Sequence, residues 1–344
     1  MLRRAVRLAA LSLALAVVSP GPAFDLRATL TEAQAEWWDL SPEGRVRALL
    51  CSRRAGKSVL LARWLVDGAR SAGVDQWCVY IALTRASAKK IAWKEVKRAA
   101  ALTGTPHKVN ESELTITFER GGAIMLGGAA TVADLERYRG IKIRRAALDE
   151  VQSWRDALLC SMIDDVIEPA CMDLHGEIAL AGTPGLIAKG KWYELTRDGA
   201  ENETGIPVRR WTAAANPYIR DVAGFLANVL KRNGWCEATP QYVREYLGRW
   251  VVDLGQLVFP VVRGRNTCSA LPTHNAAGLR LTPDGWRYVI SIDVGVRDPT
   301  AVVVLAAHRD LAHVRYVISS EKRSEWLSRD LAARLHELRK RSEE

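Results

Sequence analysis

Paired cysteine motifs are missing from this 344-residue sequence. None of the six cysteines forms a CxxC pair, and none is spaced with the six histidines as a metal site requires. This absence argues against a structural metal and a disulfide framework, and is typical of a reduced protein in the cytoplasm. We expect small buried thiols at Cys51, Cys78, Cys160, Cys171, Cys236 and Cys268.

Long hydrophobic runs, internal repeats and low-complexity segments are also missing. The apolar run Leu8–Val18 follows three arginines and is too short for a membrane span. Residues 1–24 therefore resemble a secretory signal, a basic amphipathic leader helix, or residues upstream of the natural start. We predict that this segment is not a functional signal and that the protein contacts no membrane.

Positive charge is abundant, since 49 Lys and Arg residues stand against 39 Asp and Glu residues and give a net charge of +10. An acidic polymer is one partner that this excess favours, and an arginine-rich solvated surface is the other explanation. The length suits one large domain or two medium ones.

The stretch Cys51–Ser58 reads Cys-Ser-Arg-Arg-Ala-Gly-Lys-Ser, between an apolar run at 46–50 and a helical pattern at 59–69. Strand, Gly-Lys-Ser and helix is the context of a phosphate-binding loop. The loop backbone from Ser52 through Ala55 and Gly56 and the helix start would then face phosphate oxygens. Lys57 would neutralise the β and γ phosphates, and Ser58 would bind Mg²⁺. Cys51 replaces the usual first glycine, which is tolerated where the backbone needs no positive φ.

Further polar residues could complete an ATP site. Arg53 or Arg54 is a candidate for an internal arginine finger, and Arg139 is another candidate. Gln34 either reads the adenine edge with its amide or is an ordinary surface residue.

The pair Asp149-Glu150 follows the expected strand 145–148. In ATPases of this kind the Asp holds Mg²⁺ and the Glu polarises the attacking water. Thr183 follows the next strand, 177–181, where it either senses the γ-phosphate or belongs to a Gly-Thr-Pro-Gly turn. Because strands alternate with helices, we predict an α/β fold with a mostly parallel sheet flanked by helices.

The expected strands and helices extend over most of the chain. We expect helices at 26–40, 59–69, 85–102, 156–172, 221–231, 239–247 and 326–340. We expect strands at 46–50, 76–83, 114–118, 123–126, 145–148, 177–181, 208–212, 286–293, 301–307 and 314–319.

Several of these pieces together resemble the large terminase subunit of tailed bacteriophages, over roughly Thr31 to Ala307. The matching pieces are the Gln34 region, the loop 52–58, Arg139-Gly140 ahead of Asp149-Glu150, residues 181–185, Trp211 with Asn216-Pro217, and 242–250. The resemblance implies an ATP-driven motor that moves double-stranded DNA, with a portal protein, a small terminase subunit and further copies of itself as partners. Rival interpretations are another nucleic-acid-dependent ATPase, such as a helicase, and a non-catalytic remnant that only binds nucleotide or DNA.

The same resemblance implies that Asp293 opens an RNase H-like nuclease domain, as its first ligand to Mg²⁺ or Mn²⁺. Such a domain needs strands and carboxylates beyond those found before Glu344, so we expect the nuclease part to be incomplete and inactive. The predicted organisation is a leader at 1–24, a P-loop ATPase domain at 25–255, a linker at 256–284 and a partial RNase H-like domain at 285–344.

Overall fold

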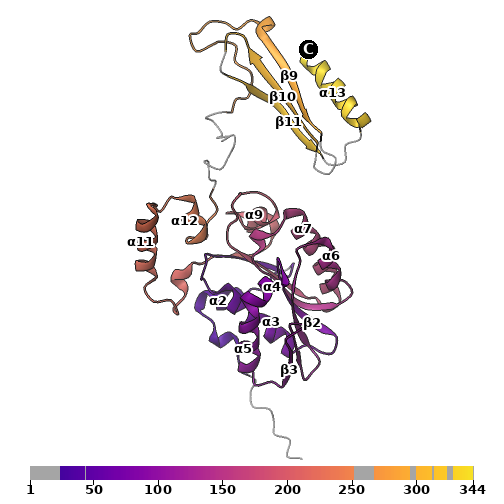
Figure 1. Ribbon diagram of the computed structural model, residues 1–344, viewed down its shortest axis with the longest axis vertical. Coiled ribbons are helices and arrows are strands. Elements are labelled where there is room, and N and C mark those ends of the chain that lie inside the picture. The colour runs from indigo at the N-terminus through magenta and orange to yellow at the C-terminus, as the bar shows by residue number, and fades with distance from the viewer. Residues whose placement is uncertain are drawn as a thin grey trace, which may run out of the picture. The chain divides into compact units, whose positions relative to one another are not determined.

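The computed structural model describes residues 24–42, 44–251, 267–294, 300–311, 314–323 and 328–343. The chain forms two compact units, Met1–Leu257 and Val258–Glu344 (Figure 1). Residues 1–23 of the expected leader and residues 256–266 of the expected linker lie outside the described residues.

The first unit is built on an eight-stranded sheet. Its strands, in spatial order, are β3 (His107–Asn110), β4 (Thr115–Phe118), β5 (Ala123–Gly128), β2 (Gln76–Ala82), β6 (Lys142–Leu148), β7 (Glu177–Gly182), β1 (Val46–Leu50) and β8 (Val208–Arg209). From β5 to β8 all neighbours are parallel, whereas β4 is antiparallel to both of its neighbours, β3 and β5. The carboxyl ends of β6, β7 and β1 therefore lie side by side at one edge.

Helices cover both faces of this sheet (Figure 1). One face packs on α2 (Glu32–Trp38), α3 (Lys57–Arg70), α4 (Arg85–Ala88) and α5 (Lys94–Leu102). The other packs on α6 (Val132–Leu135), α7 (Asp156–Cys160), α8 (Glu168–Cys171) and α9 (Lys191–Thr196). All of β1 is buried, and its side chains alternate between the two faces, because Leu49 joins the first core and Ala48 and Leu50 join the second. The predicted mixed α/β fold with a mostly parallel sheet is confirmed.

Some elements differ from the predicted ones. The expected helix 26–40 is divided, because Thr31 adopts an extended conformation and caps α2 reciprocally with Gln34. The helical runs 85–102 and 156–171 are continuous but contain π-helical turns at Lys89–Trp93 and Ser161–Ile167. Strand β3 and the short helices α9 and α10 (Ala200–Thr204) were not predicted. Helices α11 (Val222–Asn233) and α12 (Pro240–Glu245) complete the unit.

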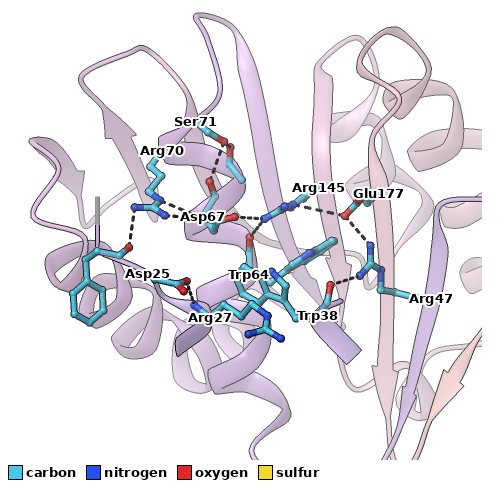
Figure 2. Close-up of polar contacts among 12 residues, drawn as sticks. Asp25, Arg27, Trp38, Arg47, Trp64, Asp67, Arg70, Ser71, Arg145 and Glu177 are labelled. Atoms are coloured by element: carbon cyan, nitrogen blue, oxygen red, sulfur yellow. Dashed lines mark hydrogen bonds and ion pairs between the residues drawn. The ribbon is translucent and has the colours of Figure 1, made fainter. Parts of the chain in front are cut away.

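A network of ion pairs ties the helices to the sheet toward the amino ends of β1, β6 and β7 (Figure 2). Arg47 of β1 is 1% exposed, donates to Glu177 Oε2 at 2.9 Å and lies over the rings of Trp37 and Trp64. Arg145 of β6 pairs with the same carboxylate at 3.7 Å and with Asp67 of α3 at 3.1 Å. Burial lowers the pKa of Arg47, and its carboxylate partner opposes that shift.

The second unit has a three-stranded antiparallel sheet, in the order β11 (Tyr316–Arg323), β10 (Thr300–His308) and β9 (Trp286–Asp293). One helix, α13 (Ser328–Glu343), buries Leu338 against Val302 and Val304 of β10. Residues 267–284 precede this sheet, with a single bridge between His274 and Arg280.

Cysteine burial agrees only partly with expectation. Cys51, Cys78 and Cys171 are buried free thiols, whereas Cys236 and Cys268 are exposed, so the prediction of uniform burial was wrong. Both exposed residues lie in loop segments that no core covers. In the part of the chain that the structure describes, no helix combines the length and apolar composition needed to cross a membrane.

Candidate nucleotide site

The loop after β1 leads into helix α3 at the carboxyl edge of the sheet. Gly56 is the N-cap of α3, with φ 87°, and no side chain caps the helix there. The N–H groups of the first turn are therefore left for an external acceptor, which is how helices bind phosphate. Cys51 is not among the described non-glycine residues with positive φ, so it can occupy the usual glycine position. Burial raises the pKa of its thiol to about 12.

Lys57 and Ser58 face the interior of the loop and the neighbouring strand end. Lys57 is 7% exposed, and its ammonium donates to the Ser52 carbonyl at 3.2 Å. The Ser58 hydroxyl lies 3.4 Å from Asp149 Oδ2. A hydroxyl and a carboxylate at this separation are the oxygen donors that Mg²⁺ takes beside a bound triphosphate. The residues present therefore fit the predicted metal and nucleotide.

Asp149 is completely buried at the end of β6. Its Oδ2 accepts from the Tyr80 phenol, and its Oδ1 accepts the backbone N–H of Glu150 at 2.8 Å. Burial raises the pKa of Asp149, and the nearby Glu150 raises it further, while Lys57 opposes both. Among the described residues neither Asp149 nor Glu150 forms an ion pair, and Lys57 is the cation that acts on Asp149 without pairing with it.

Glu150 and Thr183 lie at adjacent strand ends and share one neighbour. Glu150 adopts a left-handed backbone conformation, with φ 54°, and accepts from the Gln152 amide. The backbone N–H of Thr183 donates to the other end of that amide at 3.2 Å. Thr183 is 3% exposed, and its carbonyl accepts from Trp192 Nε1 at 2.9 Å. The structure thus brings together Lys57, Ser58, Asp149, Glu150 and Thr183.

The three candidate arginines have different surroundings. Arg53 forms an ion pair with Glu245 of α12, which raises the pKa of Arg53, and its N–H donates to the Glu245 carbonyl at 2.9 Å. Arg54 is exposed with φ 62°. Arg139 pairs with Glu136 at 3.1 Å and precedes β6. A strand rises about 3.3 Å per residue, so the length of β6 separates Arg139 from Asp149 by roughly 20 Å. The structure does not bring Arg139 to this site within one chain.

Gln34 is not a surface residue, because it is only 4% exposed. Its Nε2 donates to the Gly56 carbonyl at 3.0 Å, and its Oε1 accepts the Thr31 N–H at 3.0 Å. Both ends of the amide are engaged with the chain itself. Gln34 therefore supports the start of α3, and contact with an adenine edge stays a prediction.

Residues remote in sequence hold the loop from the other side. Trp211 Nε1 donates to the Ala55 carbonyl at 2.8 Å, and the Trp211 carbonyl accepts from the Ser52 N–H at 3.2 Å. The Ser52 hydroxyl accepts from the Ala213 N–H at 2.9 Å, and Asn216 donates to the Arg54 carbonyl at 2.9 Å. The segment 211–216 fixes the loop backbone while leaving the first turn of α3 uncapped.

Four residues of the site were missed from the sequence: Tyr80, Gln152, Glu245 and Ala213. Tyr80 is the one residue with a polar tip near the end of the apolar strand 76–82, which was the available signal. Gln152 follows the acidic pair by two positions, and nothing in the sequence separates it from an ordinary turn residue. Glu245 and Ala213 contact the loop only through the tertiary fold.

The predicted nuclease ligand Asp293 ends β9 and is exposed. No group of three or more His, Cys, Asp or Glu side chains able to hold a metal occurs among the described residues. The described residues of this unit do not assemble a two-metal site, and the inactivity of the nuclease part stays a prediction.

Comparison with solved structures gives the same fold. The chain is similar to the large terminase of bacteriophage HK97 (TM-score 0.54, 16% identity, 84% of this chain and 62% of that one). It is also similar to the large terminase of a thermophilic bacteriophage (0.51, 15%, 92% and 74%), which has also been solved with ADP (0.50, 15%, 90% and 74%). The Thermus phage P74-26 large terminase ATPase domain is a third (0.50, 16%, 66% and 97%). No protein-family model and no curated protein matches the sequence. The resemblance stated from the sequence is confirmed as a likeness of fold.

Proposed function

We propose that this chain is a phage terminase large subunit whose first unit hydrolyses ATP to move double-stranded DNA. The observation that carries the proposal is the meeting of Ser58 and Asp149 beside the uncapped start of α3. The likeness of fold to the large terminase of the thermophilic bacteriophage, which was solved with ADP, supports a nucleotide as the ligand.

In the proposed mechanism the first turn of α3 binds the phosphates and Lys57 compensates their charge. Ser58 and Asp149 would hold Mg²⁺, which when bound would draw charge from the phosphate oxygens. Glu150 orients and polarises the attacking water. Arg53 or Arg54 stabilises the charge that develops on the transferred group, and Thr183 relays hydrolysis to the rest of the unit. Residues 25–255 form the motor, 256–284 a linker and 285–344 a separate domain.

A basic helical surface supports DNA as the partner. The run 85–102 exposes Arg85, Lys89, Lys90, Lys94 and Arg98. Cations on one helix contact phosphates without reading sequence, so binding would fall steeply with salt. By the same proposal the chain acts as an oligomer with a portal protein and a small subunit.

The test is ATP turnover by the full chain, with and without linear duplex DNA. Lys57→Ala should lower kcat about 100-fold or more, because loss of one charge-stabilising donor costs ~10²–10³. The matched control is Lys142→Ala, at the opposite edge of the sheet and 4.0 Å from Asp173, which should stay within about twofold of wild type. Turnover that survives Lys57→Ala, or no turnover in wild type, would contradict the proposal and favour a non-catalytic protein.

A further inference from the structure

Gln152 connects the two strand ends that carry Glu150 and Thr183. Its Nε2 donates to the Glu150 carboxylate, and its Oε1 accepts the Thr183 backbone N–H at 3.2 Å. Thr183 directly follows β7, which lies between β6 and β1. One side-chain amide therefore links the acidic residue that follows β6 to the backbone just after β7.

The amide can satisfy both neighbours in only one orientation. A carboxylate only accepts hydrogen bonds and a backbone N–H only donates, so the NH₂ group must face Glu150 and the oxygen must face Thr183. Gly182 makes room for this arrangement, because a Cβ there would lie 2.5 Å from Gln152 Oε1. A side chain at position 182 would therefore displace the Gln152 amide, which is a reason for glycine there besides the turn.

Both ends of the connection are held by buried indoles. Trp154 Nε1 donates to the Asp149 carbonyl at 3.3 Å, and Trp192 Nε1 donates to the Thr183 carbonyl at 2.9 Å. Glu150 leaves β6 in a left-handed conformation that turns its side chain toward the amide. The indoles bind carbonyl groups and leave the Thr183 N–H to the Gln152 amide, so a movement of the β7 end would reach Glu150 through that amide.

We propose that Gln152 is a positioning residue that sets the direction of the Glu150 carboxylate according to the position of the Thr183 N–H. When the end of β7 moves, the amide oxygen loses its donor, the amide turns, and the carboxylate loses its restraint. This inference rests on the proposed function, because it assigns a regulatory link to the residue that polarises water.

Two substitutions separate this role from simple support of the turn. Gln152→Glu keeps the size and the acceptor for Thr183 but places a second carboxylate against Glu150. Gln152→Leu removes both hydrogen bonds. If Gln152 only supported β7, Gln152→Glu would behave as wild type, whereas a positioning role makes it as damaging as Gln152→Leu.

Gln76 offers a matched control at the opposite end of the sheet. Its Oε1 also accepts a backbone N–H, that of Gly73, at 3.1 Å, and it is half-buried like Gln152. We expect both Gln152 variants to lower kcat about tenfold or more with ATP affinity within twofold. Gln76→Glu and Gln76→Leu should leave both quantities unchanged. Wild-type kcat in Gln152→Glu would overturn the proposal.

Hydrogen exchange at the Thr183 amide tests the connection without any turnover. We expect the Thr183 N–H to exchange about tenfold faster in Gln152→Leu. It should also exchange faster in Glu150→Ala, where the NH₂ group of the Gln152 side chain has lost its acceptor. Unchanged exchange at Thr183 in Gln152→Leu would overturn the inference even if ATP is hydrolysed. If wild type shows no Lys57-dependent turnover, the proposed function fails, and the exchange rates alone then support or overturn the connection.

Discussion

The carboxylates at the two edges of the parallel sheet have different kinds of partner. Toward the amino ends, Glu177 lies between Arg47 and Arg145, and Asp67 lies between Arg145 and Arg70 (Figure 2). Each carboxylate there has two arginine partners. At the carboxyl edge, the described residues give Asp149 and Glu150 no ion pair, and neutral groups hold them instead.

This difference separates stability from function. A buried ion pair is strongly stabilising only in the sense that removing one partner leaves the other charge unpaired. A buried carboxylate without a cation costs stability until a ligand supplies the positive charge. The carboxylates of the amino edge are therefore paired with cations of the chain itself. Under the proposed function, those of the carboxyl edge are paired only when Mg²⁺ and ATP are bound.

The largest expected effect is at Glu177. Glu177→Gln leaves Arg47 buried beside a neutral amide, and we expect a loss of about 3–5 kcal/mol in the free energy of unfolding. Urea unfolding of the full chain measures it, with ATP affinity as the check that the site survives. The control is Glu136→Gln at the exposed pair with Arg139, which should cost less than about 1 kcal/mol. Equal losses in the two variants would remove the contrast between buried and exposed pairs.

Replacing one carboxylate at each edge should change Tm by a smaller amount, and in opposite directions at the two edges. The raised pKa of Asp149 means that the folded chain binds this proton more tightly than the unfolded chain does. Its contribution to stability therefore decreases as pH rises from the ordinary Asp value through the raised one, so ionisation of Asp149 destabilises the ligand-free fold. Asp149→Asn should raise Tm by ~2–4 °C for each kcal/mol of destabilisation by the carboxylate that it removes. It should also abolish turnover.

Asp67→Asn is the partner experiment, because it removes a carboxylate that pairs with Arg145 at 3.1 Å and Arg70 at 2.9 Å. It should lower Tm and leave turnover within about twofold. Thermal unfolding at pH 7 without nucleotide measures both variants. A fall in Tm in both would mean that Asp149 is held as a structural charge and not kept for a ligand.

The sequence predicted those parts of the fold that depend on local pattern. The strands expected at 46–50, 76–83 and 177–181 were found to within one residue, because each is a short apolar run followed by turn residues. The helix 26–40 was predicted too long because its apolar spacing conceals the break at Thr31. The exposed strand β3 and the short helices α9 and α10 carry too little apolar periodicity to be recognised.

The site was predictable to the same extent. Lys57, Ser58 and Asp149 belong to short motifs that follow strands, so their convergence follows from a parallel sheet. Arg139 precedes its strand, which by the same rule puts it at the opposite edge. Tyr80 and Gln152 act through contacts between different strands, and pairing of that kind is set by the tertiary fold.

The most direct measurement of the central claim is the thermal stability of the full chain with and without Mg²⁺ and ATP. A ligand present at 100 times its Kd stabilises the fold by about 2.7 kcal/mol. The account predicts a rise in Tm of several degrees for wild type and for Asp67→Asn, and almost none for Lys57→Ala. An equal rise in Lys57→Ala, or no rise in wild type, would contradict it.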